Sequence, residues 1–144
     1  MAAKGSPAHG IDFDLDIDDG GGTPRGVEGD CVDVSWPMAV AVAEAHGAGD
    51  SYEEYIAGLK GSRGSATFRL NDVATVGSWT VLSAALGATR TITYAPLGGS
   101  AGYPEIEAEC IITEINPSSN LTSVTGFTIS WVTTSTITVT TVGA

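Results

Sequence analysis

The sequence predicts an all-β fold: a β-sandwich with one short flanking α-helix. Apolar and polar residues alternate with a period of two in several short segments, which is typical of strands with one buried face. Clusters of Gly, Pro and Asn separate these segments and favour turns. The clearest helical spacing is confined to residues 78–87. A single helix among six or seven strands indicates an all-β architecture and not an α/β fold.

The N-terminal part begins with small and polar residues over 1–10, for which we expect a flexible arm before a single domain at 11–144. Residues 11–18 then alternate strictly, with apolar side chains at odd positions. This segment is predicted to be a strand with one apolar and one anionic face. Its even positions are acidic: Asp12, Asp14, Asp16 and Asp18.

The following segments are less uniform. Residues 31–36 resume the alternation until Pro37 interrupts it. Residues 38–45 combine alanine with alternating valine, so helix and strand both stay open there. We expect a short helical turn over 52–56, capped by Asp50 or Ser51, and a strand over 66–70.

The predicted helix at 78–87 has Ser78 at the N-cap position and Gly87 as a C-terminal stop. Trp79, Leu82 and Leu86 fall on one face and are the candidate core residues of this helix. A helix of about two and a half turns is unstable alone, so it is expected to pack on the sheet.

The C-terminal part contains four further predicted strands, at 90–94, 104–115, 122–133 and 136–142. The strand at 104–115 has an apolar face that includes Cys110. Its opposite face is acidic and carries Glu105, Glu107 and Glu109.

The charge of the chain is strongly negative, with 17 Asp and Glu against six Lys and Arg and a net charge of −11. Few, scattered cations argue against nucleic-acid binding and against anionic membrane surfaces. We recognise no signal peptide and no apolar run of about 20 residues, so no membrane association is expected. Cys31 and Cys110 are expected to be buried thiols, and a bridge between them stays open.

The sequence does not match the common motifs of catalysis and metal binding. Asp14, Asp16 and Asp18 have the spacing of the first ligands of an EF-hand loop, but Asp19 replaces its glycine and Arg25 its final glutamate. Two histidines and two isolated cysteines do not form a zinc motif, and nucleophile-elbow and phosphate-loop motifs are absent. We therefore expect no enzyme, no catalytic residue, no metal and no cofactor.

Two segments carry a resemblance to a known family. Residues 31–35 (Cys-Val-Asp-Val-Ser) and 50–61, which end in Gly-Leu-Lys-Gly, resemble tail tube (major tail) proteins of long-tailed bacteriophages or related tailed viruses. The predicted strand, Trp/Leu helix and Pro-closed strand follow in the family's order, and Val124-Thr125-Gly126 resembles its closing strands. The resemblance covers about residues 30–130. The acidic strand at 11–18 and the Ala-rich segment at 38–45 are not part of the family's pattern.

This resemblance implies a virion structural protein that forms hexameric rings, which stack into the tail tube. Strands of all subunits would join in one β-barrel around a channel for DNA during ejection. The implied partners are the chain itself, the tape measure, terminator and distal tail proteins, and passing DNA without specific binding. The location would be the virion tail, assembled in the host cytoplasm.

An acidic strand is expected to line the channel, because an anionic wall does not hold DNA. Either Asp12, Asp14, Asp16 and Asp18 or Glu105, Glu107 and Glu109 would do so, and an outer-surface position stays open for both sets. Another virion β-sandwich, such as a capsid decoration or tail terminator protein, is the second hypothesis. A secreted carbohydrate- or calcium-binding sandwich is the third.

Overall fold

The computed structural model describes residues 12–143, so the predicted N-terminal arm at 1–10 lies outside the described residues. The predicted all-β class with one short helix is confirmed. A one-turn 3-10 helix, η2, spans Glu28–Asp30. The strands are β1 (Asp14–Asp18), β2 (Pro24–Gly26), β3 (Cys31–Ser35), β4 (Met38–Glu44), β5 (Tyr55–Arg69), β6 (Thr89–Ala95), β7 (Pro104–Ser118), β8 (Gly126–Thr133) and β9 (Thr138–Thr141), and the α-helix is α1 (Ser78–Leu82).

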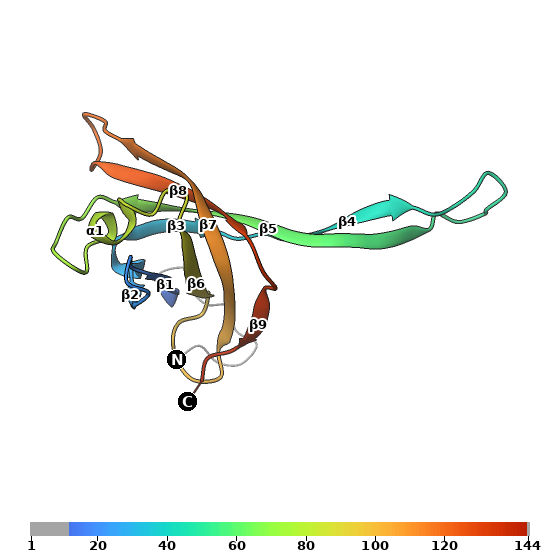
Figure 1. Ribbon diagram of the computed structural model, residues 1–144, viewed down its shortest axis with the longest axis horizontal. Coiled ribbons are helices and arrows are strands. Elements are labelled where there is room, and N and C mark those ends of the chain that lie inside the picture. The colour runs from blue at the N-terminus through green and yellow to red at the C-terminus, as the bar shows by residue number, and fades with distance from the viewer. Residues whose placement is uncertain (1–11, 144) are drawn as a thin grey trace.

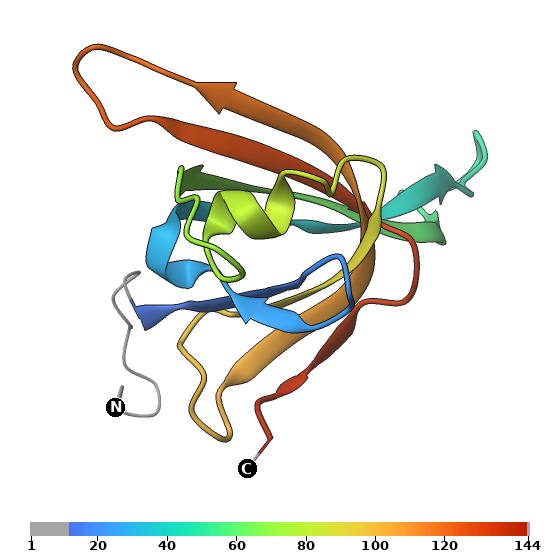
Figure 2. The same ribbon diagram turned by 60° about the vertical axis from the view of Figure 1, so that its left-hand side comes forward.

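All nine strands belong to one antiparallel sheet, with the order β2-β1-β6-β7-β8-β5-β3. β4 pairs with β5, and β9 pairs with the start of β7. The sheet curls so that β1, β2 and β6 lie across the core from β3 and β5 (Figures 1 and 2). The two halves face each other as in a sandwich, but the sheet is continuous and, within one chain, does not close into a barrel.

The core lies between these two halves. Leu15 and Ile17 of β1 meet aromatic side chains of β5 and β8 in one buried cluster. Phe68 and Phe127 stack with ring centroids 5.2 Å apart, and Trp131 contacts a second tryptophan edge-on at 5.6 Å. Each fully buried large side chain contributes about 1.5–3 kcal/mol through removal of apolar area from water.

The helix α1 is shorter than predicted, because it ends at Leu82. Leu82 is fully buried, and Trp79 packs edge-on against Phe127 with centroids 5.2 Å apart. Placing Leu86 in the core was wrong: it lies beyond the helix and is 62% exposed. Helical spacing no longer applies past the last turn, and Ala85 is buried in its place.

The start of α1 also differs from the prediction. Gly77, not Ser78, is the N-cap residue. The Ser78 hydroxyl is buried and donates to the backbone carbonyl of Arg69 at 2.9 Å, which ties the helix to the end of β5. At the other end, Gly87 has φ +77° and donates its N–H to the carbonyl of Ile112.

The short helical turn predicted at 52–56 was wrong, because β5 begins at Tyr55. Tyr55 and Ile56 pair with the end of β4, so long-range pairing overrides the local helical signal. The segment 38–45, for which helix and strand were both open, is largely β4. Among the described residues, no helix combines the length and apolar character needed to span a membrane.

Candidate functional site

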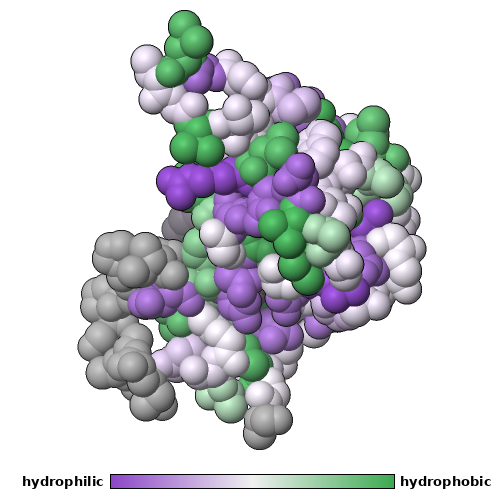
Figure 3. Space-filling model, turned by 90° about the vertical axis from the view of Figure 1, so that its left-hand side faces the viewer, coloured by the Kyte–Doolittle hydropathy of each residue, from purple (hydrophilic) through white to green (hydrophobic). Residues whose placement is uncertain are grey.

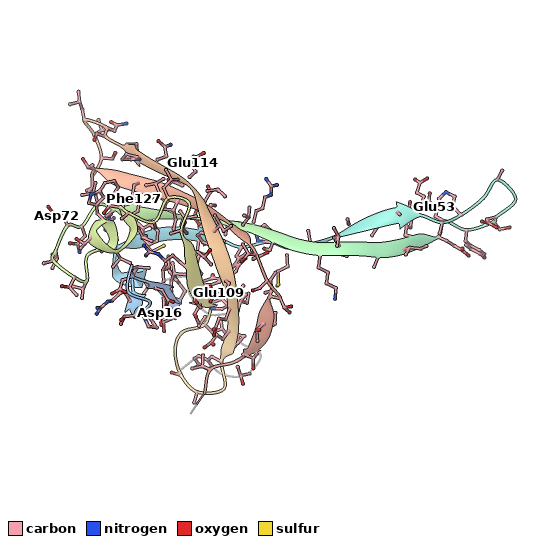
Figure 4. All side chains as sticks on the ribbon, in the orientation of Figure 1. Asp16, Glu53, Asp72, Glu109, Glu114 and Phe127 are labelled. Carbon is pink, nitrogen blue, oxygen red and sulfur yellow. The ribbon has the colours of Figure 1, made fainter. Side chains whose placement is uncertain are left out.

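The two acidic sets predicted from the sequence lie on one face of the sheet. Asp16 pairs with Thr93, and Thr93 pairs with Glu107, so these three residues stand abreast on the side away from the core. Their chain neighbours Leu15 and Ala108 are buried. We call this surface the acidic face, and Asp16 and Glu109 mark it in Figure 4. Its members are Asp14, Asp16, Asp18, Glu105, Glu107 and Glu109, and Asp12 is exposed just before β1.

Three carboxylates crowd together on this side of the body. Oxygens of Asp14, Asp16 and Glu28 all lie within 4.8 Å of one another. Partial burial, and then the charges of Asp14 and Glu105, raise the pKa of Asp16. Partial burial is also the main cause that raises the pKa of Glu28, and the charge of Asp14 adds to it. Carboxylates are the donors that Ca²⁺ takes, but three of them fall short of its six to eight oxygen ligands.

A long hairpin projects from the body (Figure 1). It consists of β4 and residues 55–61 of β5, and we call it the arm. All residues of both segments are exposed, whereas from Ser62 onward β5 alternates between buried and more exposed positions. Its large apolar side chains are Met38, Val40, Val42, Tyr55, Ile56 and Leu59.

An exposed hairpin of this kind has little stability of its own in water. An isolated two-stranded hairpin is marginally stable, and large apolar side chains exposed on both of its strands favour an interaction surface. The arm was not predicted, because the Ala-Val alternation in 38–45 is compatible with both helix and strand. The available signal was the absence of charge in the apolar run from Met38 to Ala43, in which the β-branched Val40 and Val42 alternate with alanine.

The end of the arm, residues 44–54, is an acidic loop, which we call the tip. It carries four carboxylates, from Glu44, Asp50, Glu53 and Glu54, and no Lys or Arg. Backbone and side-chain hydrogen bonds organise it: Ala45 donates to the carbonyl of Glu54 at 2.8 Å, and Gly47 donates to the Asp50 carboxylate at 2.5 Å. Figure 4 shows Glu53 on the arm, far from the acidic residues of the body.

A groove lies at the other end of the arm, where it joins the body. Met38, Val40 and Lys60 of the arm form one wall, and residues 133–137 form the other. We call this cavity of about 640 Å³ the foot groove. Its lining combines apolar side chains, including Ile137, with the hydroxyl-bearing residues 133–136.

Cations are distributed unevenly over the described part of the chain. Arg25 forms an ion pair with Asp19 at 3.0 Å. Arg90 is buried and donates to the carbonyls of Asp18 at 2.6 Å and Val81 at 3.2 Å, which holds β1 against α1. The exposed cations without an ion pair among the described residues are Lys60, Arg63 and Arg69, all on β5.

The side of the body opposite the arm is mixed in character. Figure 3 shows hydrophobic and hydrophilic side chains interspersed over this face. The β7–β8 hairpin forms a second projection, with Leu121 and Val124 exposed near its end. The two cysteines are free, and Cys110 is buried while Cys31 is partly exposed, so the structure contains no bridge between them.

No protein-family model and no curated protein matches the sequence, but solved structures do. A chain from the tail of an empty gene transfer agent particle, refined helically with C6 symmetry, matches with a TM-score of 0.75 at 10% identity, covering 93% of this chain and 99% of that chain. The chain shares its fold with proteins of tail-type particles. An extracellular contractile injection system, in its sheath–tube complex, contains a match with a TM-score of 0.67 at 12% identity, covering 99% of both chains.

The baseplate of the anti-feeding prophage also contains this fold, with a TM-score of 0.64 at 11% identity over the full length of both chains. At such identities these likenesses establish the fold alone. They extend over 93% to 100% of the chain.

Proposed function

We propose that this protein is the structural subunit of a tail tube, which self-assembles into hexameric rings that stack around a channel. The observation that carries the proposal is the near full-length likeness to a chain of a C6-symmetric gene transfer agent tail. The exposed apolar arm supports it, because such a surface needs a partner.

The arm and the body suit a head-to-tail contact between copies. The arm is one surface and the body another, so their contact is heterologous, and such contacts close into rings when the rotation allows. The finished particle would be the tail of a virion, assembled in the host cytoplasm. Tape measure, terminator and distal tail proteins would meet the tube at its channel and ends.

The acidic face is the surface that we assign to the channel. Duplex DNA carries dense negative charge, and an anionic wall lets it pass without being held. In this assignment both acidic sets line the channel together. β1 and β7 lie on either side of β6, and their acidic side chains are on the same face of the sheet. The proposal assigns no catalysis, metal or cofactor to the chain.

Negative-stain microscopy of the purified chain tests the assembly. Stacked six-fold rings or tubes with an axial channel are expected, whereas monomers or trimers would favour a decoration protein and contradict the tube. A Val42→Asp, Leu59→Asp variant should stay folded by circular dichroism and fail to polymerise, because both side chains are exposed on the arm.

The channel assignment has its own test. Replacing Glu105, Glu107 and Glu109 with Lys should slow DNA ejection and leave tubes intact, because a cationic wall binds phosphate. Replacing Asp72, which is exposed in the segment between β5 and α1, with Lys is the control. Unchanged ejection by the triple variant would contradict a channel position for this face.

A further inference from the structure

The tip and the foot groove have complementary chemistry. The tip presents Tyr52, 85% exposed, next to Glu53 and Glu54. The foot groove presents apolar side chains, a row of hydroxyl-bearing residues and the Lys60 ammonium group. An aromatic residue with a polar hydroxyl and flanking carboxylates matches each of these three features.

The residues of the tip differ in how free they are to bind. The hydroxyl of Tyr55, the first residue of β5, donates to the Glu53 carboxylate of the tip at 3.1 Å. Tyr52 protrudes further, and tyrosine is enriched among the residues that dominate interface energies. Tyr52 is therefore the anchor that we assign to the tip, with Glu54 and Glu53 as its charged flank.

The groove has the size and charge for such an anchor. A cavity of about 640 Å³ accommodates an aromatic side chain with room for neighbouring atoms. Lys60 is one of only three exposed cations without an ion pair among the described residues, and the only one of these three lining the groove. In a chain of net charge −11, attraction between copies depends on such few cations.

A tip cannot reach the groove of its own arm. Tyr55, next to the tip, and Lys60 are five positions apart on one extended strand, a distance of about 17 Å. β4 pairs with this part of β5 and holds it extended. A tip that docks into a foot groove must therefore come from a second copy.

We propose that the tip of one subunit docks into the foot groove of a second copy, with Tyr52 as the anchor and Glu53 and Glu54 facing Lys60. This inference rests on the proposed self-assembly and specifies its contact. The contact is head-to-tail, because each subunit offers its tip to one neighbour and its groove to another.

Photo-crosslinking tests the contact directly and does not require tubes. The photoreactive residue benzoyl-phenylalanine at position 52 of the full chain should crosslink to residues 38–40 or 133–137 of a second copy, identified by mass spectrometry. Crosslinks to the acidic face, or none between copies, would overturn the proposal. Stacked rings without this crosslink contradict this inference alone, and this crosslink without rings contradicts only the hexameric tube.

Charge reversal tests the pairing within tubes. Lys60→Glu should lower pelletable polymer by about tenfold or more, because like charges then face each other. Adding Glu53→Lys and Glu54→Lys to that variant should restore polymer to within about threefold of the original chain. Arg69→Glu on the same strand is the control, since Arg69 does not line the groove. Failure of the triple variant to recover, or normal polymer from Lys60→Glu alone, would overturn the pairing.

Discussion

The body and the arm share strand β5, but they differ in how far its side chains are buried. In β5, residues 62–69 place buried and more exposed side chains in alternation, whereas residues 55–61 are exposed on both faces. The body therefore buries a core of its own, whereas the arm leaves its large apolar side chains exposed. Both regions form strands, so the difference between them is burial: the single chain stabilises the body by burying its apolar side chains and does not do so for the arm.

The largest difference is expected when one apolar side chain is truncated in each region. Phe127→Ala should lower the free energy of unfolding by about 3–5 kcal/mol, because this ring is buried against two others. Leu59→Ala on the arm should change it by less than about 0.5 kcal/mol in the dispersed chain. Urea denaturation measures both, and equal losses would contradict the comparison.

Two glycines of β5 provide a second test of the difference between body and arm. A Cβ on Gly64 would overlap the indole of Trp131, whereas a Cβ on Gly61 meets no other atom within 4 Å. Gly64→Ala should therefore destabilise the dispersed chain by about 1–3 kcal/mol through overpacking, and Gly61→Ala should not. Thermal unfolding followed by circular dichroism separates the two. A melting temperature that falls equally in both variants would be inconsistent with the packing described.

A smaller effect is expected from pH at the acidic cluster of the body. The pKa values of Asp16 and Glu28 are raised in the folded chain. Protonation therefore favours the folded state, and this contribution is fully present below the unfolded pKa values of 3.8 and 4.5 and is lost as pH rises through the raised values.

Asp16→Asn removes one of the two charges whose ionisation destabilises the folded chain. The variant should therefore be more stable at neutral pH by no more than about 1 kcal/mol, since Asp16 and Glu28 are both partly exposed. The gain should shrink towards acid pH, as denaturant titrations at several pH values would show. Asp72→Asn, at an exposed position outside the cluster, is the matched control. A gain for Asp16→Asn that does not depend on pH would contradict this explanation.

The smallest effect concerns thiol reactivity. Burial raises the pKa of Cys31 to about 11 and that of Cys110 to about 12. Few thiolates are then present at neutral pH, so alkylation of the folded chain should be slow and should accelerate on unfolding. Mass spectrometry of iodoacetamide-treated protein measures this, and rapid labelling of Cys110 in the native chain would contradict its burial.

The sequence predicted the parts of the fold that depend on local pattern. Alternation around Leu15 and Cys110 placed β1 and β7 with the correct buried faces. It also predicted both acidic sets, but not that they share one face, because that depends on β6 lying between β1 and β7. Strand order is a long-range property that period-two patterns do not contain.

The arm and the end of the helix could not be predicted for related reasons. The pairing of Tyr55 and Ile56 with the end of β4 makes these two residues extended, and no local propensity predicts this long-range pairing. Leu86 fitted the apolar spacing of a helix, but the helix ends four residues earlier. The foot groove arises only where residues 133–137 meet the arm, so its lining is invisible in one segment of sequence.

Hydrogen–deuterium exchange tests the contrast between body and arm most directly. Amides of residues 38–44 and 55–61 should exchange rapidly in the dispersed chain and become protected in assembled particles, whereas those of residues 62–69 should be protected in both. Strong protection of the arm in the dispersed chain, or an arm that stays unprotected in assembled particles, would contradict the claim that a second copy stabilises it.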